Sequence, residues 1–439
     1  MRHIDWGSRK AGSQTIMFRA CVFSIALLLA AGCLTVAVME AQQTAAVTVY
    51  EGARLITGDG SAPIADSAFI VENGRFTAVG QKGKLKVPAN AAHVDLTGKT
   101  VMPAIVDAHK HLSPMRAELV DQLQHFAYYG IGGTMSLGQD TGDEVYGVRT
   151  ETIPNAARYR TAGRGLTGPE PNRSHAPFFV TTEAEARKDV DEMAAKKVDI
   201  IKFWIDDRDH TVTKLSPELY RAGIDEAHKK GFRTIAHIFT LEDAKGALRA
   251  GIDNFAHSVR DQDVDDEYIK LIKAKPGFIV DPNLPDRGVK VDRSWLRDSM
   301  PAAEFQKVQA ETKDDPKEQA FFGIQCRNLG RLSKEGIKIA LGSDGPIPWA
   351  AHEEMADMAG CGMTPAQVIV AATRNAADLM KLTDAGTVAA RKSADFLVLD
   401  ANPLDDITNT RRISSVYLRG AQVDRAALRA KWTGGTSSR

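Results

Sequence analysis

Apolar residues occur in short runs near both ends of the chain, and turn residues separate these runs. Asn73-Gly74, between two of the runs, is a pair typical of a two-residue β-hairpin turn. The pattern predicts short β-strands at both ends, with a small antiparallel unit at the first. The runs lie at 47–50, 68–71, 76–79, 394–399 and 415–418.

Through the middle of the chain, apolar strand-like runs alternate with longer amphipathic segments. One predicted helix, 217–230, has Ser216 as N-cap and Pro217 at its first position, and it ends at Gly231. The other predicted helices are 182–196 and 241–250. Strands are predicted at 101–107, 134–137, 199–204, 233–237, 254–257, 278–280 and 337–341. This alternation predicts an α/β fold with a parallel sheet, most simply a (β/α)8 TIM barrel.

The two β segments at the chain ends are each too small to fold alone. We therefore expect them to join into one small composite β-sandwich beside the barrel. The expected parts are the N-terminal part of the sandwich at 42–102, the barrel at 103–384, the C-terminal part of the sandwich at 385–425 and a tail at 426–439.

Residues 1–41 are typical of an export signal, because basic residues precede an uncharged apolar run at 20–39. Three outcomes are open. Ala30-Ala31-Gly32-Cys33 resembles a bacterial lipobox, which would place a lipid on Cys33; cleavage after Ala41 would release a soluble protein; and an uncleaved signal would anchor the chain in a membrane. We expect an exported protein that is periplasmic, membrane-anchored as a lipoprotein, or secreted.

Composition narrows the functional classes further. The 439 residues include 56 Lys+Arg and 56 Asp+Glu, so the net charge gives no reason to expect a nucleic-acid partner. Hydrophobic residues make up 43% and charged residues 26%, which excludes a disordered chain and a protein with many membrane spans. The 4 cysteines form neither a disulfide framework nor a Cys-rich zinc site, although Cys326 and Cys361 could pair outside the cytoplasm.

Several predicted strands end in side chains that can bind a metal. In a barrel the carboxyl ends of the strands meet at one mouth, and residues i and i+2 of a strand share a face. His109 and His111 can therefore bind one cation together, while Lys110 should point away. Imidazole and carboxylate are ligands that zinc and similar dications prefer. The predicted ligands are His109, His111, Lys202, His237, His257 and Asp344.

Lys202 is the unusual member of this set, because a charged lysine near the end of an apolar strand is costly to desolvate. Two interpretations are open. Its ammonium could extend to the barrel rim. Alternatively its amine, kept neutral by nearby cations, has reacted with carbon dioxide to form a carbamate, a carboxylate mimic that can bridge two metals.

Four residues near the predicted mouth are candidates for substrate binding. Trp204 follows Lys202 by two residues and can share its face. Arg208 and His210 lie in the next loop, where they could bind a substrate carboxylate, and Asn283 follows a later strand. Alternatively, Trp204 is an aromatic residue of the core at the barrel rim, and Arg208 and His210 lie in a solvated loop without a role in binding.

The same segments resemble the amidohydrolase superfamily over about residues 47–420, and the most similar subgroup is the prolidase-like and imidazolonepropionase-like binuclear enzymes. The segments that carry the resemblance are 98–112 (GKTVMPAIVDAHKHL), 199–202 (DIIK), 342–344 (GSD), 363–365 (MTP), 372–377 (ATRNAA) and 394–404 (ADFLVLDANPL).

The resemblance implies a site with two divalent metal ions, and zinc is the expected metal. His109 and His111 would hold the more buried ion with Asp344, and His237 and His257 would hold the second. Carboxylated Lys202 and a hydroxide would bridge the two ions.

The expected function is hydrolysis of an amide or peptide-like C–N bond in a small molecule, of the dipeptide or N-acyl amino acid type. The metal-bridging hydroxide would attack, with Asp344 as general base and acid. The alternatives are an ester or lactone hydrolase with the same centre, a deaminase, and a non-catalytic exported metal-binding protein. A homo-oligomer is also expected.

Overall fold

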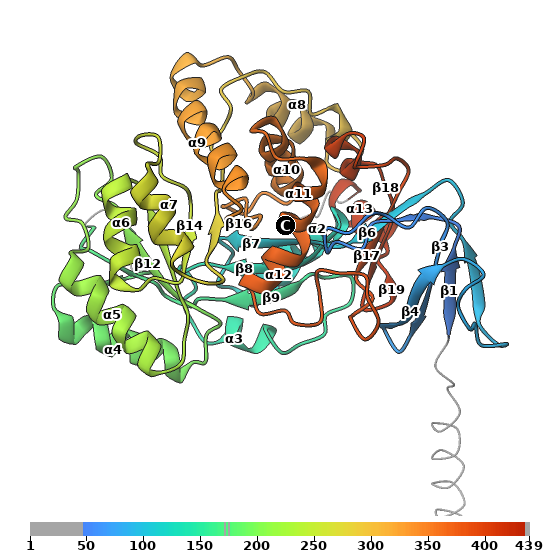
Figure 1. Cartoon of the computed structure of the whole chain (residues 1–439), viewed down its shortest axis with the longest axis horizontal. Helices are drawn as coiled ribbons and strands as arrows, with labels where there is room; N and C mark the ends of the chain where they lie inside the picture. Colours follow the sequence, from blue (N-terminus) through green and yellow to red (C-terminus); the bar gives the residue numbers. More distant parts are fainter. Residues whose placement is uncertain (1–46, 171–172, 174–175, 435–439) are drawn as a thin grey trace, which may run out of the picture. The chain divides into compact units, whose positions relative to one another are not determined.

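The computed structural model describes residues 47–170, 173 and 176–434 (Figure 1). The predicted export signal, with Cys33 and Ala41, lies outside the described residues. In the described part of the chain, no helix combines the length and apolar character that crossing a bilayer requires.

Two parallel sheets occupy the middle of the chain. One has three strands in the order β7-β8-β9, and the other has seven in the order β11-β10-β12-β13-β14-β15-β16. The strands are β7 (Ile105–Lys110), β8 (Ile131–Ser136), β9 (Arg158–Thr161), β10 (Leu166–Thr167), β11 (Phe178–Phe179), β12 (Ile201–Ile205), β13 (Thr234–Ile238), β14 (Asn254–Ala256), β15 (Ile279–Asp281) and β16 (Lys338–Ile339).

Backbone hydrogen bonds connect the three-stranded sheet to the larger sheet on both sides. Asp199 N–H donates to the Thr161 carbonyl at 2.9 Å, which joins the end of β9 to the start of β12. On the other side, Ala108 N–H donates to the Leu341 carbonyl at 2.9 Å, which joins β7 to the segment after β16. The first and last parallel strands are therefore neighbours in space.

Helices follow most of these strands, and local sequence signals account for their ends. Thr182 and Glu185 form a reciprocal capping box at the start of α4. Ser216 stands at the N-cap of α5, but its hydroxyl donates to Glu218 at 2.8 Å. The helices are α2 (Arg116–Tyr128), α3 (Glu144–Val148), α4 (Glu183–Ala195), α5 (Pro217–Lys229), α6 (Leu241–Ala250), α7 (Asp266–Lys273), α8 (Ala302–Ala310), α9 (Pro316–Lys334), α10 (Ala350–Gly360), α11 (Pro365–Val370), α12 (Ala376–Leu379) and α13 (Arg425–Thr433).

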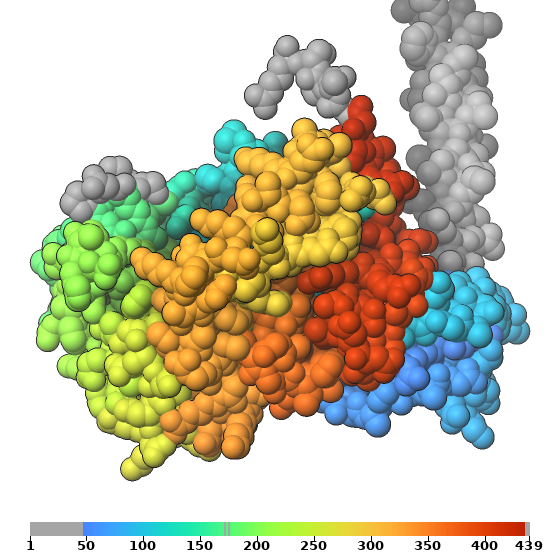
Figure 2. All heavy atoms as spheres, turned by 90° about the horizontal axis from the view of Figure 1, so that it is seen from above, coloured from blue at the N-terminus to red at the C-terminus, as the bar shows by residue number. Residues whose placement is uncertain are grey.

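The two ends of the chain share one antiparallel-rich sheet. β6 pairs with β17, with Val101 opposite Val398, in a five-stranded sheet of order β19-β18-β17-β6-β2. Figures 1 and 2 both place the blue N-terminal strands beside the red C-terminal segment. A four-stranded sheet, β4-β3-β1-β5, lies next to it in the chain. The strands are β1 (Thr48–Glu51), β2 (Arg54–Leu55), β3 (Ser67–Glu72), β4 (Arg75–Gln81), β5 (Ala92–Asp95), β6 (Thr100–Pro103), β17 (Phe396–Leu399), β18 (Ile413–Leu418) and β19 (Ala421–Gln422).

Aromatic side chains from both sheets pack in one apolar cluster. The ring centroids of Phe69 and Phe396 are 5.2 Å apart, and those of Tyr50 and Tyr417 are 5.4 Å apart, all edge-to-face. Such pairs contribute about 0.5–1.5 kcal/mol each beyond the area they bury. Residues separated by more than three hundred positions in the chain are thereby held together.

The structure agrees with the predicted hairpin and differs from the sequence analysis at two strands and one helix. Asn73 and Gly74 both have positive φ, 51° and 71°, as a two-residue turn between β3 and β4 requires. β9 and β10 were not predicted, because the short stretch that contains them has a broken apolar pattern. The segment expected only as a tail, 426–439, is largely helical, because α13 begins one residue before it at Arg425.

Cys326 in α9 and Cys361 after α10 form a disulfide, with 4.9 Å between their Cα atoms. The sequence had left this pairing open. Disulfides persist in oxidising compartments and are rare in the cytosol. The bond closes a separation of 35 residues and ties two helices together.

Loss of this bond should lower the free energy of unfolding by about 2–4 kcal/mol. We expect Cys326→Ser, Cys361→Ser and the double variant to have the same reduced stability in chemical denaturation, since each removes the same cross-link. The wild-type protein under strong reductant should match them. A double variant clearly less stable than either single variant would show that the cysteines do not act as one bond.

Candidate metal centre

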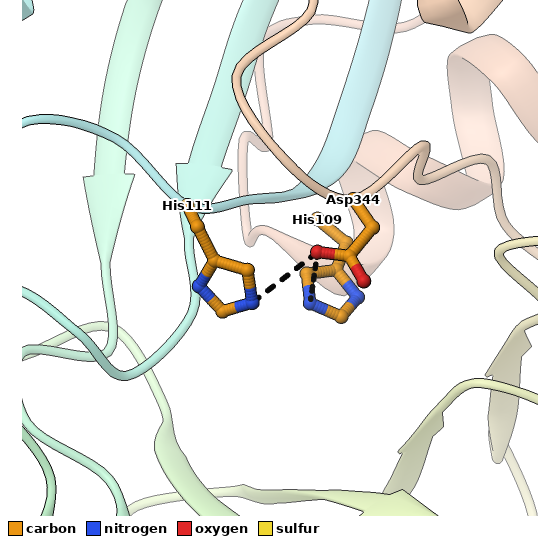
Figure 3. Close-up of side chains that lie close together, drawn as sticks. All are labelled: His109, His111 and Asp344. Carbon is orange, nitrogen blue, oxygen red and sulfur yellow. Dashed lines mark ion pairs between the residues drawn. The ribbon is translucent and has the colours of Figure 1, made fainter. Parts of the chain in front are cut away.

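His109, His111 and Asp344 come together at the ends of two strands that the fold makes neighbours. Figure 3 shows both imidazoles facing the carboxylate. Oδ1 of Asp344 lies 3.8 Å from Nε2 of His109 and 3.3 Å from Nε2 of His111. One ligand atom from each residue lies within 4.8 Å of the others, so this group could hold a metal ion.

Local backbone geometry directs Asp344 into this position. Its N–H donates to the His109 carbonyl at 2.9 Å, and its φ is 54°. Gly345 N–H donates to Oδ1 at 2.7 Å. Although burial raises the pKa of Asp344, the nearby His109 and His111 lower it more, so the pKa lies well below its usual range.

Gly342, in the segment that leads to Asp344, is required by close packing. A Cβ there would lie 2.2 Å from Oδ2 of Asp281 and 2.6 Å from Cβ of His109. Any larger residue would push the Asp344 loop away from β7. The glycine therefore sets the distance between the carboxylate and the imidazoles.

His237 and His257 extend the same group of side chains. Their ring centroids are 4.4 Å apart, and the ring of His257 is 5.0 Å from that of His109. Nε2 of His257 lies 3.8 Å from Oδ2 of Asp344. Burial lowers the pKa of His237 to about 3, and burial with the Arg260 charge takes that of His257 well below its ordinary value. Both rings are thus neutral at neutral pH, the form that binds cations.

Lys202, on β12, is fully buried and its Nζ has no hydrogen-bond partner among the described residues. The amine lies 5.3 Å from the centre of the Trp204 ring. Burial lowers its pKa to about 7, so a large fraction of the amine is neutral at neutral pH. The side chain does not reach bulk solvent, which removes the interpretation of a lysine extending to the rim.

Two hydrogen bonds orient the candidate ligands from behind. Oδ1 of Asn283 accepts from Nδ1 of His109 at 2.8 Å, which leaves Nε2 as the free lone pair toward Asp344. Oδ2 of Asp206 accepts from Nε2 of His237 at 3.1 Å, which leaves Nδ1 free. Carboxylates and carbonyls in this position fix the tautomer of metal-binding histidines.

The four predicted substrate-binding residues have different surroundings. Trp204 is buried, and its ring stacks on that of His111 at 6.3 Å. Asn283 lies behind His109, and Arg208 pairs with Asp206 at 2.7 Å. The side chain of His210 is 89% exposed and pairs with Asp207, so the structure does not bring it to the centre.

Sequence reasoning missed Asp281, Asp206 and Arg260 and treated Lys110 correctly. Lys110 points away from the centre, and its Nζ donates to Ser343 at 2.5 Å. Asp281 comes directly after the predicted strand at 278–280. Asp344 was predicted as a ligand because it follows a strand, and the same reasoning could have identified Asp281. Both its carboxylate oxygens are buried without a hydrogen-bond partner in the described chain, and burial with the Asp107 charge raises its pKa well above the usual value.

The donor set fits divalent cations. Nε2 of His109 and Nζ of Lys202 are buried without hydrogen-bond partners in the described chain, and they face a carboxylate and further neutral imidazoles. An unpaired buried polar group costs about 1–3 kcal/mol. A cation that accepts these lone pairs would remove that cost.

Comparisons with known proteins agree with this geometry. The model of the Amidohydrolase family matches residues 100–423. Imidazolonepropionase from Deinococcus radiodurans is 25% identical over 387 residues, which cover 82% of this chain and 92% of that protein. A crystal structure from Bifidobacterium longum, provisionally described as a prolidase, has a TM-score of 0.71 and 25% identity, covering 88% of this chain and 99% of that chain.

An uncharacterised protein of Mycobacterium tuberculosis is 29% identical over 179 residues, or 39% of this chain and 48% of the relative. The chain thus spans about half the length of the curated relatives that it matches first. The family match, however, contains every candidate ligand from His109 to Asp344. The resemblance found in the sequence is confirmed: this chain belongs to the amidohydrolase family, whose fold is of the TIM-barrel type with mixed α/β content.

Proposed function

We propose that this chain is a metal-dependent hydrolase that cleaves an amide or peptide-like C–N bond in a small molecule of the dipeptide or N-acyl amino acid type. The observation that carries the proposal is the cluster of His109, His111, His257 and Asp344, whose rings and carboxylate lie within contact of one another. The names of the relatives, imidazolonepropionase and prolidase, belong to enzymes that act on C–N bonds, and they support the reaction class.

We infer that the two parallel sheets form one closed (β/α)8 barrel at 103–384, because hydrogen bonds join both of their edges. In this interpretation β9 and β10 together are the third strand. The sheets at 42–102 and 385–425 would form the composite sandwich, which their shared strand pairing and aromatic cluster support.

His109, His111 and Asp344 would hold one divalent ion and His237 and His257 a second, with zinc suited to this donor set. Lys202 would contribute a carbamate between them. Two such ions lower the pKa of a shared water and polarise a carbonyl group.

The chain's own residues would handle the protons. Asp344 is ionised at neutral pH, so it can accept a proton from the attacking water. It would then give that proton to the leaving amine. Asn283 and Asp206 hold His109 and His237 in fixed tautomers, and Trp204 would place an apolar ring beside His111.

Export would agree with the disulfide between Cys326 and Cys361, which needs an oxidising compartment. We retain the three endings proposed for the signal, including a lipid on Cys33 and an uncleaved anchor. We also propose that the protein acts on a small-molecule substrate, forms a homo-oligomer and does not bind nucleic acid.

Hydrolysis should depend on metal and should favour amides. We expect the metal-replete protein to release amine from dipeptides or N-acyl amino acids, to lose activity with chelator and to regain it with zinc. A panel that also contains esters, lactones and aminated heterocycles tests this. Preference for a lactone or release of ammonia would replace the proposal, and no turnover by protein with bound metal would contradict it.

Asp344→Asn should lower kcat by about 100- to 10,000-fold, because the amide cannot accept a proton from water. Metal content must be measured on the same sample, since Asp344 is also a candidate ligand. The exposed Asp298→Asn is the matched control and should behave as wild type. Full turnover by Asp344→Asn with metal bound would exclude the general-base role.

Lys202 should take up carbon dioxide. With ¹³C-labelled bicarbonate, the protein should give a carbamate NMR signal that Lys202→Ala removes and Lys229→Ala, at a solvent-exposed position, retains. Metal content should fall with the signal and recover with added short carboxylic acids. A carbamate signal that survives Lys202→Ala would place the modification elsewhere.

A further inference from the structure

Three arginines lie on the side of the centre formed by β12 and β14. Arg173 covers the Trp204 ring, with its guanidinium carbon 4.4 Å from the ring centre. Arg208 follows β12, and Arg260 follows His257 by three residues. Their charges interact with one another and with Asp206, so they form one electrostatic group.

The first two arginines have carboxylate partners within the chain. Arg173 pairs with Glu170 at 2.9 Å. Arg208 pairs with Asp206 at 2.7 Å and lies 3.7 Å from Glu170. Asp206 in turn orients His237. These guanidinium groups therefore maintain the wall of the centre, and their charges are already balanced.

Arg260 differs from both. In the described part of the chain its guanidinium forms no ion pair with a carboxylate, and its Nε is buried without a partner. Among the described residues, its guanidinium donates a single hydrogen bond, to Nδ1 of His257, a neutral ring. A guanidinium keeps its positive charge at neutral pH. Asp344 and Asp206 attract it only from beyond ion-pair distance, and a buried charge without a directly paired opposite charge is costly.

The partner of Arg260 is also a candidate metal ligand, and a neutral imidazole has a single lone pair. If Nδ1 of His257 binds a cation, that lone pair is used. If Nε2 binds the cation, the proton lies on Nδ1. In both cases Nδ1 cannot accept from Arg260. Metal binding at His257 therefore leaves the guanidinium beside the centre with all its donors available.

We propose that Arg260 binds a carboxylate group of the substrate and makes this enzyme selective for anionic amides over neutral ones. This inference rests on the proposed function and names its substrate class. A guanidinium offers two parallel donors to a carboxylate, which fixes the substrate's orientation as well as its charge. The carboxylate would supply the direct ion pair that the described part of the chain does not give Arg260, since Asp344 and Asp206 act on its charge only from beyond ion-pair distance.

Binding of succinate and succinamate to the zinc-loaded protein tests this by calorimetry. Both probes carry one carboxylate for the centre, and they differ only in whether the other end is charged. Wild type should bind succinate at least tenfold more tightly. Arg260→Met should weaken the binding of succinate about 30-fold and change the affinity for succinamate less than threefold, at equal zinc content. Arg260→Gln should give the same two results. Arg249→Met, at an exposed position on α6, is the matched control.

Equal weakening of both probes, or an unchanged preference for succinate, would overturn the assignment. Arg260→Lys should keep part of the preference, because it keeps the charge and loses the paired donors. The measurement does not require turnover, so absence of amide hydrolysis would contradict the proposed function without deciding this test. Hydrolysis with no preference for charge would contradict only the role of Arg260.

Discussion

The backbone hydrogen bond from Asp344 to the His109 carbonyl joins the segment after the last parallel strand to the first strand, and the arrangement of the centre depends on it. It places a carboxylate from residue 344 beside imidazoles from residues 109 and 111. Gly342 makes the approach possible, because no Cβ fits between Asp281 and His109. The register of the intervening strands does the rest: Trp204 lies opposite His237, and Ala256 lies between His237 and Asp281.

The centre is built from groups whose burial opposes folding. A lysine, three imidazoles and the carboxylate of Asp281 are withdrawn from water, and several of their polar atoms have no partner in the described chain. Unpaired buried groups cost free energy that the surrounding apolar packing must offset. The same withdrawal keeps the imidazoles neutral and takes the pKa of Lys202 to about 7, so it prepares them for cations. Desolvation therefore both lowers the stability of the fold and keeps the candidate ligands in the neutral form that binds cations.

Polar residues behind the candidate ligands orient the imidazole rings. Asn283 and Asp206 select the tautomers of His109 and His237, and Arg208 holds Asp206. Arg260 stands apart because, among the described residues, it contacts an imidazole and pairs with no carboxylate. Arg173 and Arg208 thus pair with carboxylates of the chain, whereas the guanidinium of Arg260 could pair with a carboxylate of the substrate. That difference comes from pairing, since all three belong to the same electrostatic group.

The sequence by itself determined the alternating middle of the chain, the two β ends and the positions of the candidate ligands. These follow from local patterns: apolar runs, helix caps, the Asn73-Gly74 turn, and polar residues placed just after strands. Long-range packing decided what local patterns do not encode. It paired Cys326 with Cys361, formed β9 and β10 from a weakly patterned stretch, turned His210 to solvent and moved Asn283 behind His109. It also left Arg260 without a paired carboxylate in the part of the chain that the structure describes, because a side chain's partners come from distant segments that meet only when the protein folds.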